Sequence, residues 1–68
     1  MATALTQKLA AMRQEAACIE RGIRGYLCTE EHLSADDKAQ AEVTLRLAVG
    51  LRRTLAKWLV AKDPTAAA

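Results

Sequence analysis

The chain has 68 residues and a formal net charge of +2, and 51% of its residues are hydrophobic. This length allows one domain at most, and the small, interspersed charge favours a soluble surface over a site for polyanions. No stretch approaches the about 20 apolar residues of a membrane span. The N-terminus also lacks the basic region and continuous apolar run of a secretory leader.

A protein this small is expected to need support beyond its own core. Chains below roughly 70–80 residues often depend on disulfides, metal or oligomerisation. Structural zinc takes four ligands, usually in close pairs, whereas this chain has one histidine, His32, and two cysteines, Cys18 and Cys28. We therefore expect no metal and no other cofactor.

The two cysteines are also poorly placed for a disulfide. On one helix Cys18 and Cys28 would lie about 15 Å apart along the axis, and a disulfide needs Cα atoms within about 7 Å. Two unpaired thiols favour a reducing compartment, so we expect a cytoplasmic protein. Oligomerisation or a partner protein remains as the source of additional stability.

Residues from about 3 to 28 are expected to form the first helix. Apolar residues recur there at alternating spacings of four and three, the pattern of antiparallel hairpins and coiled coils. They are Leu5, Leu9, Met12, Ala16, Ile19, Ile23 and Tyr26. These residues fall within an arc of roughly 100°. We predict that they form the intramolecular seam, with Arg13, Glu20 and Arg24 facing solvent.

Small residues form a second row on the same helix. Ala4, Ala11, Cys18 and Gly25 recur every seven residues. A smooth row of this kind can accept another helix closely, so we include Ala11 and Cys18 in the predicted partner-binding surface. The alternative is that alanine is a common helix residue and the alignment is chance.

A turn over 29–34 is expected to lead into a second helix over 35–62. Ser34 is a suitable N-cap, and Asp36 and Asp37 place carboxylates in the first turn, where the helix dipole favours them. Asp63 and Pro64 end the helix. The tail, 63–68, is expected to be disordered.

The second helix has a wider apolar arc than the first helix can cover. The arc spans about 220°, compared with a little over 100° in a typical amphipathic helix. We predict that Leu55, within this arc, meets the seam of the first helix. Two edges of the arc are then left uncovered: Leu47, Leu51 and Trp58 on one side, and Leu45, Val49 and Val60 on the other. Exposed apolar patches mark interaction sites, so both edges are predicted to bind a partner.

No set of residues suggests catalysis. His32 has Glu31 beside it, but both fall in the expected turn, and a two-helix fold offers no pocket for them. We therefore expect the protein not to be an enzyme. Arg46, Arg53 and Lys57 share one face of the second helix and could contact phosphates. Because the net charge is small, a solvated basic face is expected there and a nucleic-acid partner is not.

Three features together resemble a known family. Leu5 and Leu9 follow a short N-terminus, basic–glycine pairs stand at Arg21-Gly22 and Arg24-Gly25, and 45–59 is rich in aliphatic residues. This layout resembles the small helical-hairpin co-chaperones of the type III secretion needle subunit. The resemblance implies a cytoplasmic hairpin that pairs with a larger helical-repeat chaperone, the two together keeping the needle protein from polymerising.

The predicted fold class is all-α, a coiled-coil-like antiparallel hairpin of two helices completed by a partner or by oligomerisation. The leading functional hypothesis is a non-enzymatic co-chaperone or adaptor that binds a helical-repeat chaperone or a secreted subunit. The alternative is an RNA-binding regulator, a homodimeric four-helix bundle whose core is the wide apolar arc. In that case Arg46, Arg53 and Lys57 would face RNA. A third possibility is a structural fragment of a larger assembly.

Overall fold

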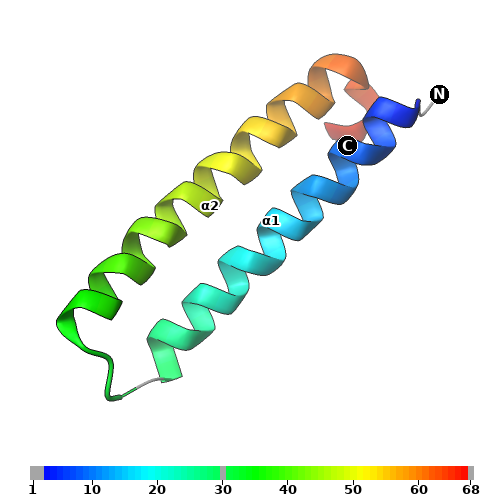
Figure 1. Cartoon of the computed structure of the whole chain (residues 1–68). Coiled ribbons are helices and arrows are strands. Elements are labelled where there is room, and N and C mark those ends of the chain that lie inside the picture. Colours follow the sequence, from blue (N-terminus) through cyan, green and yellow to red (C-terminus); the bar gives the residue numbers. More distant parts are fainter. Residues whose placement is uncertain (1–2, 30, 68) are drawn as a thin grey trace.

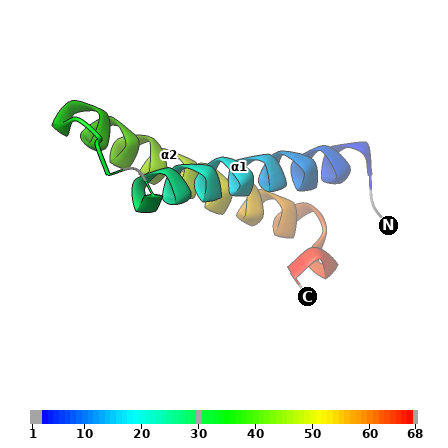
Figure 2. The same ribbon diagram turned by 90° about the horizontal axis from the view of Figure 1, so that it is seen from below.

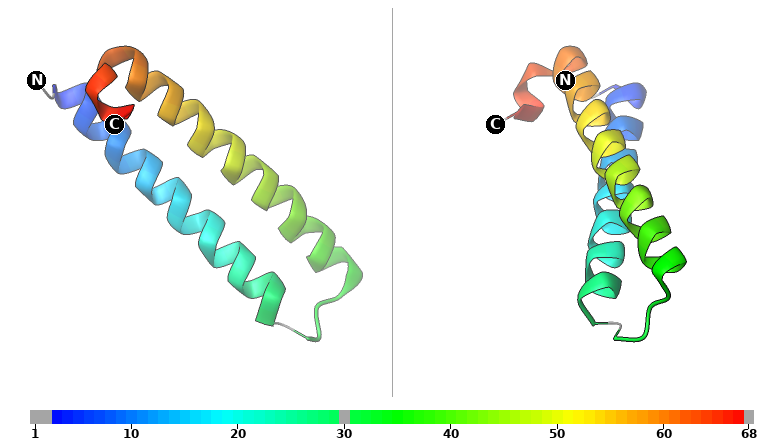
Figure 3. Two further views of the ribbon diagram at one scale, coloured as in Figure 1. Left: turned by 180° about the vertical axis from the view of Figure 1, so that it is seen from behind. Right: turned by 90° about the vertical axis from the view of Figure 1, so that its left-hand side faces the viewer.

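The computed structural model of the protein describes residues 3–29 and 31–67. Helix α1 (Ala4–Thr29) and helix α2 (Ala35–Lys62) lie side by side and antiparallel, and a short 3-10 helix, η1 (Pro64–Ala67), follows α2 (Figure 1). The predicted all-α hairpin is therefore confirmed, and both long helices begin and end within one residue of the expected bounds. Figure 2 and Figure 3 show that the two helices cross at a shallow angle.

Two threonines fix the start of α1. The Thr6 N–H donates to Thr3 Oγ1 at 3.2 Å, and the Thr3 N–H donates to Thr6 Oγ1 at 2.7 Å. This reciprocal pair is a capping box in which threonine takes the place of the usual glutamate or glutamine. Thr6 is also buried. The cap therefore sets where α1 begins.

The start of α2 follows the sequence-based expectation. Ser34 is the N-cap, and its side chain accepts a hydrogen bond of 3.1 Å from the Asp37 N–H. Asp36 and Asp37 occupy the first turn and Lys62 occupies the last. The charges of the helix ends thus complement the helix dipole.

The end of α2 differs from the expectation of a disordered tail. The Asp63 N–H donates to the Leu59 carbonyl at 2.8 Å. The Asp63 carboxylate then accepts hydrogen bonds from the Thr65 N–H at 3.2 Å and the Thr65 hydroxyl at 2.6 Å. These bonds turn the chain into η1, where the sequence predicted a disordered tail. Ala68 lies outside the described residues.

The core of the hairpin is small and lies toward the end that holds both termini. Its buried apolar residues are Leu9, Ala16, Ala48, Leu55 and Leu59. Leu9 is fully buried, and the predicted seam position of Leu55 agrees with its burial. Toward the turn, Ile23, Leu27 and Leu45 are only partly buried. The two helices are therefore held together mainly by their contacts at the terminal end.

The packing face of α1 is rotated from the predicted seam. Leu9 and Ala16 are buried and Ile23 is partly buried, as expected. The other four predicted seam residues are exposed: Leu5, Met12, Ile19 and Tyr26. Arg13 and Glu20, which were expected to face solvent, are partly buried instead.

The physical reason for the rotation is Arg52, which lies on the packing face of α2. Its guanidinium Nε donates to Glu20 Oε1 at 2.9 Å across the hairpin. A partly buried cation requires a carboxylate partner, and Glu20 reaches Arg52 only if α1 turns this side toward α2. Arg24, predicted to face solvent, does so.

Candidate protein-binding face

The residues displaced from the predicted seam gather with exposed residues of α2 on one side of the hairpin. Leu5, Met12, Ile19 and Tyr26 follow each other at seven-residue intervals along α1. At 100° per residue this row and the row of Leu47, Leu51 and Trp58 on α2 fall on the same flank of the hairpin, because the helices are antiparallel. We call these seven residues the apolar face.

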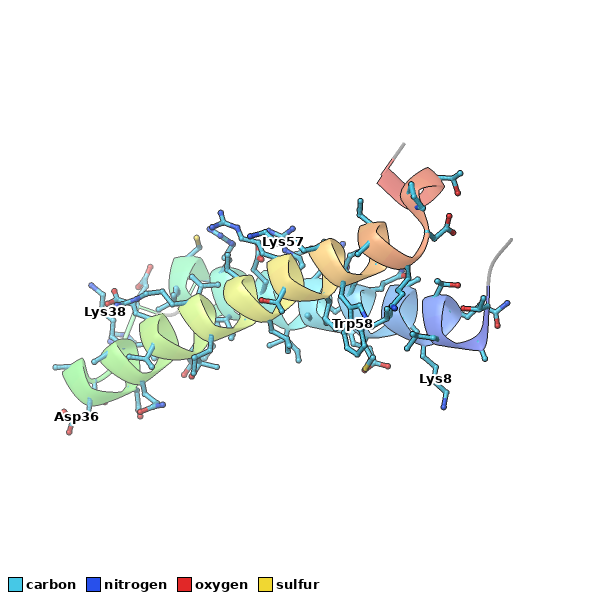
Figure 4. The ribbon with its side chains drawn as sticks, turned by 90° about the horizontal axis from the view of Figure 1, so that it is seen from above. Lys8, Asp36, Lys38, Lys57 and Trp58 are labelled. Carbon is cyan, nitrogen blue, oxygen red and sulfur yellow. The ribbon has the colours of Figure 1, made fainter. Side chains whose placement is uncertain are left out.

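Figure 4 places labelled side chains on the two sides of the hairpin. Trp58 and Lys8, which precedes Met12 by one helical turn, project on the same side (Figure 4). Lys57 projects on the opposite side. The arrangement agrees with the helical projection, which puts Trp58 and Lys57 on opposite sides of the hairpin.

The apolar face is exposed to an extent that is unusual for large hydrophobic residues. Leu47 is 70% exposed, Ile19 53% and Trp58 46%. The chain has 5195 Å² of accessible surface, whereas a compact folded chain of 7.4 kDa is expected to have about 4,200 Å². The chain as a whole therefore exposes about 1,000 Å² more surface than a compact chain of this mass.

The elongated shape accounts for this excess. The chain measures 48 × 19 × 16 Å and has a radius of gyration of 14.8 Å, compared with about 11 Å for a compact domain of this length. Two helices alone cannot surround a core, so each leaves one flank uncovered. A third or fourth helix on the apolar face would supply the missing layer.

The two predicted edges of the wide apolar arc of α2 differ in their exposure to solvent. The first edge, Leu47, Leu51 and Trp58, is exposed as part of the apolar face. The second edge is mixed: Leu45 and Val49 are partly buried, whereas Val60 is exposed at 37%. Leu45 and Val49, which were expected on an uncovered edge, are thus less accessible than Val60. The rotation of α1 brings its packing face over this second edge and away from the first.

The predicted row of small residues lies at the outer margin of the apolar face. Ala11 and Cys18 are exposed. A Cβ atom added at Gly22 or Gly25 would meet no atom within 4 Å. This margin of α1 is therefore open to an approaching backbone.

A shallow groove between the helices lies on the side opposite the apolar face. It is lined by Ala10, Arg13, Gln14, Ala17, Glu20, Arg21, Arg52 and Ala56. The Glu20 carboxylate is bound to Arg52 and also to Arg24, whose Nε lies 3.3 Å from Oε2. The hydrogen bond from Arg52 lowers the pKa of Glu20 from its ordinary value of 4.5, against the opposing effect of desolvation. This ion-pair network fixes the register of the helices.

The remaining candidate side chains are His32 and the two cysteines. His32 is exposed in the turn, and Cys18 and Cys28 are exposed free thiols, of which Cys18 Sγ accepts a hydrogen bond of 3.1 Å from Arg21 Nη2. Within 3–29 and 31–67, no group of three or more His, Cys, Asp or Glu side chains could hold a metal ion. In the same part of the chain, neither long helix has the apolar stretch needed to cross a membrane.

Comparison of the chain with protein-family models, with curated proteins and with solved structures gives no match.

Sequence reasoning missed the exposed α1 row and the interhelical ion pair, although a signal for both was present. Thr6, Arg13, Glu20 and Leu27 also recur at seven-residue intervals. With Leu9 and Ala16 they form a second possible packing face. Arg52 on the opposing helix favours the second face, because only that face supplies a carboxylate, Glu20.

Proposed function

We propose that the protein is a non-enzymatic interaction module that binds a helical partner protein through its apolar face. The observation that carries this proposal is the alignment of seven exposed apolar side chains, from two antiparallel helices, on one flank. The two rows follow neighbouring helices about 8–10 Å apart. An amphipathic helix laid between them would bury its apolar residues in the manner of helix-in-groove recognition.

Trp58 is the expected anchor of this interface. Tryptophan is enriched among the residues that contribute most to protein–protein binding, and Trp58 lies on the apolar face beside Leu51 in the same row. Binding would also stabilise the hairpin, because a ligand of the folded state shifts the folding equilibrium by mass action. The small core makes such stabilisation valuable to this chain.

The more specific form of the proposal is a small cytoplasmic co-chaperone. The resemblance to the co-chaperones of the type III secretion needle subunit supports it, as do the free thiols of Cys18 and Cys28. In that setting the partner is a helical-repeat chaperone or the secreted subunit itself. The apolar face would supply the helical layer that completes the partner's groove.

The test is retention of a defined partner by face-specific variants. Tagged wild-type protein is expressed in its own host, its bound protein is identified and the pair is then reconstituted from purified components. Leu51→Asp and Trp58→Asp are expected to abolish the complex while circular dichroism shows intact helices. Gln14→Asp, an equal change in charge on the opposite face, is the matched control. A complex that survives both apolar-face substitutions would contradict the proposal.

A further inference from the structure

All six arginines of the chain lie on the side opposite the apolar face. They are Arg13, Arg21, Arg24, Arg46, Arg52 and Arg53. Arg13, Arg21 and Arg52 line one groove, and the helical projection places the other three on the same flank. Lys57 projects on this side as well. We call these seven residues the arginine face.

Few carboxylates neutralise the arginine face. Glu20 and Glu42 are the two acidic residues that the projection places on it, so seven cations carry a net charge of about +5, against +2 for the whole chain. Glu20 is bound by Arg24 and Arg52. Within the described residues the other five cations form no ion pair: Arg13, Arg21, Arg46, Arg53 and Lys57. These side chains are available to an anionic ligand.

The sequence alone predicted only the part of the arginine face that lies on α2. By helical spacing Arg46, Arg53 and Lys57 share one face of α2 with Glu42, and Arg21 and Arg24 are neighbours on α1. The hairpin adds Arg13, Arg21 and Arg24 from α1 alongside the cations of α2. Eleven residues separate Arg13 from Arg24, and likewise Arg46 from Lys57, so each row extends for about 17 Å.

The identity of the cations favours phosphate. Guanidinium groups match phosphate oxygens in a bidentate geometry and are weakly hydrated. Phosphates of one strand of a duplex are spaced about 3.4 Å apart along its axis, so a row of about 17 Å passes about five of them. Tyr26 and Trp58 both lie on the apolar face, which leaves the arginine face without an aromatic ring for base stacking.

We propose that the arginine face binds the phosphate backbone of a nucleic acid duplex without reading its bases. Contacts to phosphate position a protein on a duplex but carry no sequence information. The site is on the opposite side from the apolar face, so both can be occupied at once. It is independent of the proposed partner, and Trp58→Asp is expected to leave duplex binding unchanged.

The test is fluorescence anisotropy with labelled 20-base-pair RNA and DNA duplexes at 50–200 mM KCl. Contact with four or five phosphates is expected to give a slope of about −4 in a plot of log affinity against log salt. Arg21→Gln and Arg53→Gln are each expected to weaken binding and to reduce the slope by about 1. Lys8→Gln removes the same charge from the other side of the hairpin and is expected to change neither quantity. The RNA and DNA titrations identify which duplex is preferred.

Three results would overturn the proposal. The first is the absence of binding to either duplex at 50 mM KCl. The second is an equal effect of Lys8→Gln and Arg53→Gln, which would indicate attraction to net charge rather than to this face. The third is displacement of the duplex by a glutamate-rich peptide at lower concentration than by unlabelled duplex, which would assign the face to an acidic protein.

Discussion

Glu20 of α1 and Arg52 of α2 are 32 positions apart in the chain, yet Glu20 Oε1 and Arg52 Nε lie 2.9 Å apart in the middle of the hairpin. The Glu20 side chain is 14% exposed and that of Arg52 36%. This pair forms only when α1 is rotated so that the side with Glu20, rather than the row from Leu5 to Tyr26, is turned toward Arg52. The position of the apolar face follows from that rotation.

Replacing Glu20 is expected to destabilise the hairpin and to loosen its register. In Glu20→Gln the Arg52 guanidinium stays partly buried without a counter-charge, which is less favourable than the native pair. The melting temperature should fall relative to wild type. Glu15→Gln is the control, because Glu15 is an exposed carboxylate on the same helix without an ion pair in the described part of the chain. Equal melting temperatures for the two variants would contradict a structural role for the pair.

The same pair predicts a pH dependence of stability. The folded state lowers the pKa of Glu20 below 4.5, so the folded protein binds a proton at this site less readily than the unfolded chain. The stabilisation is therefore complete above pH 4.5 and is lost as the pH falls below it through the lowered pKa. Urea unfolding at a series of pH values should show this acid loss in wild type and a weaker loss in Glu20→Gln. Parallel profiles would show that other carboxylates cause the acid sensitivity.

The rotated packing face predicts opposite behaviour for two leucines one turn apart. Leu9→Ala removes a fully buried side chain and is expected to lower the free energy of unfolding by about 2–5 kcal/mol. Leu5→Ala removes a side chain that is 39% exposed and should cost much less. Chemical denaturation measures both. Similar losses would favour the seam predicted from sequence, in which the two leucines are equivalent.

These residues also show which features of the hairpin could not be predicted from the sequence. Heptad spacing, Ser34 and Pro64 were sufficient to predict two helices and their bounds, because these signals are local. The rotation of one helix against the other depends on pairing across 32 positions, which a helical projection of either helix alone does not contain. Leu5 and Ile19 were therefore assigned to the seam although they lie on the apolar face. Leu47 and Trp58 were predicted as exposed because no row on α1 could reach them in either arrangement.

Replacing glycines within the helices should stabilise the protein. The same substitutions test whether the row of small residues on α1 binds a partner. A Cβ added at Gly25 or Gly50 meets no atom within 4 Å, and neither glycine has a positive φ. Each substitution by alanine is expected to raise the free energy of unfolding by up to about 1 kcal/mol. If a partner helix approaches α1 over Ala11, Cys18 and Gly25, Gly25→Ala should weaken the complex while Gly50→Ala leaves it intact. Equal affinities would remove this margin from the binding surface.

The single tryptophan distinguishes a foreign partner from a second copy. Trp58 is 46% exposed, so the free chain should show the red-shifted emission of an indole in water. Titration with a foreign helical partner at constant hairpin concentration is expected to shift this emission to the blue. The midpoint of the shift should depend on the partner concentration. Light scattering of the chain alone should then give the monomer mass over the same range. A blue shift that grows with hairpin concentration, together with a doubled mass, would instead show that a second copy covers the apolar face.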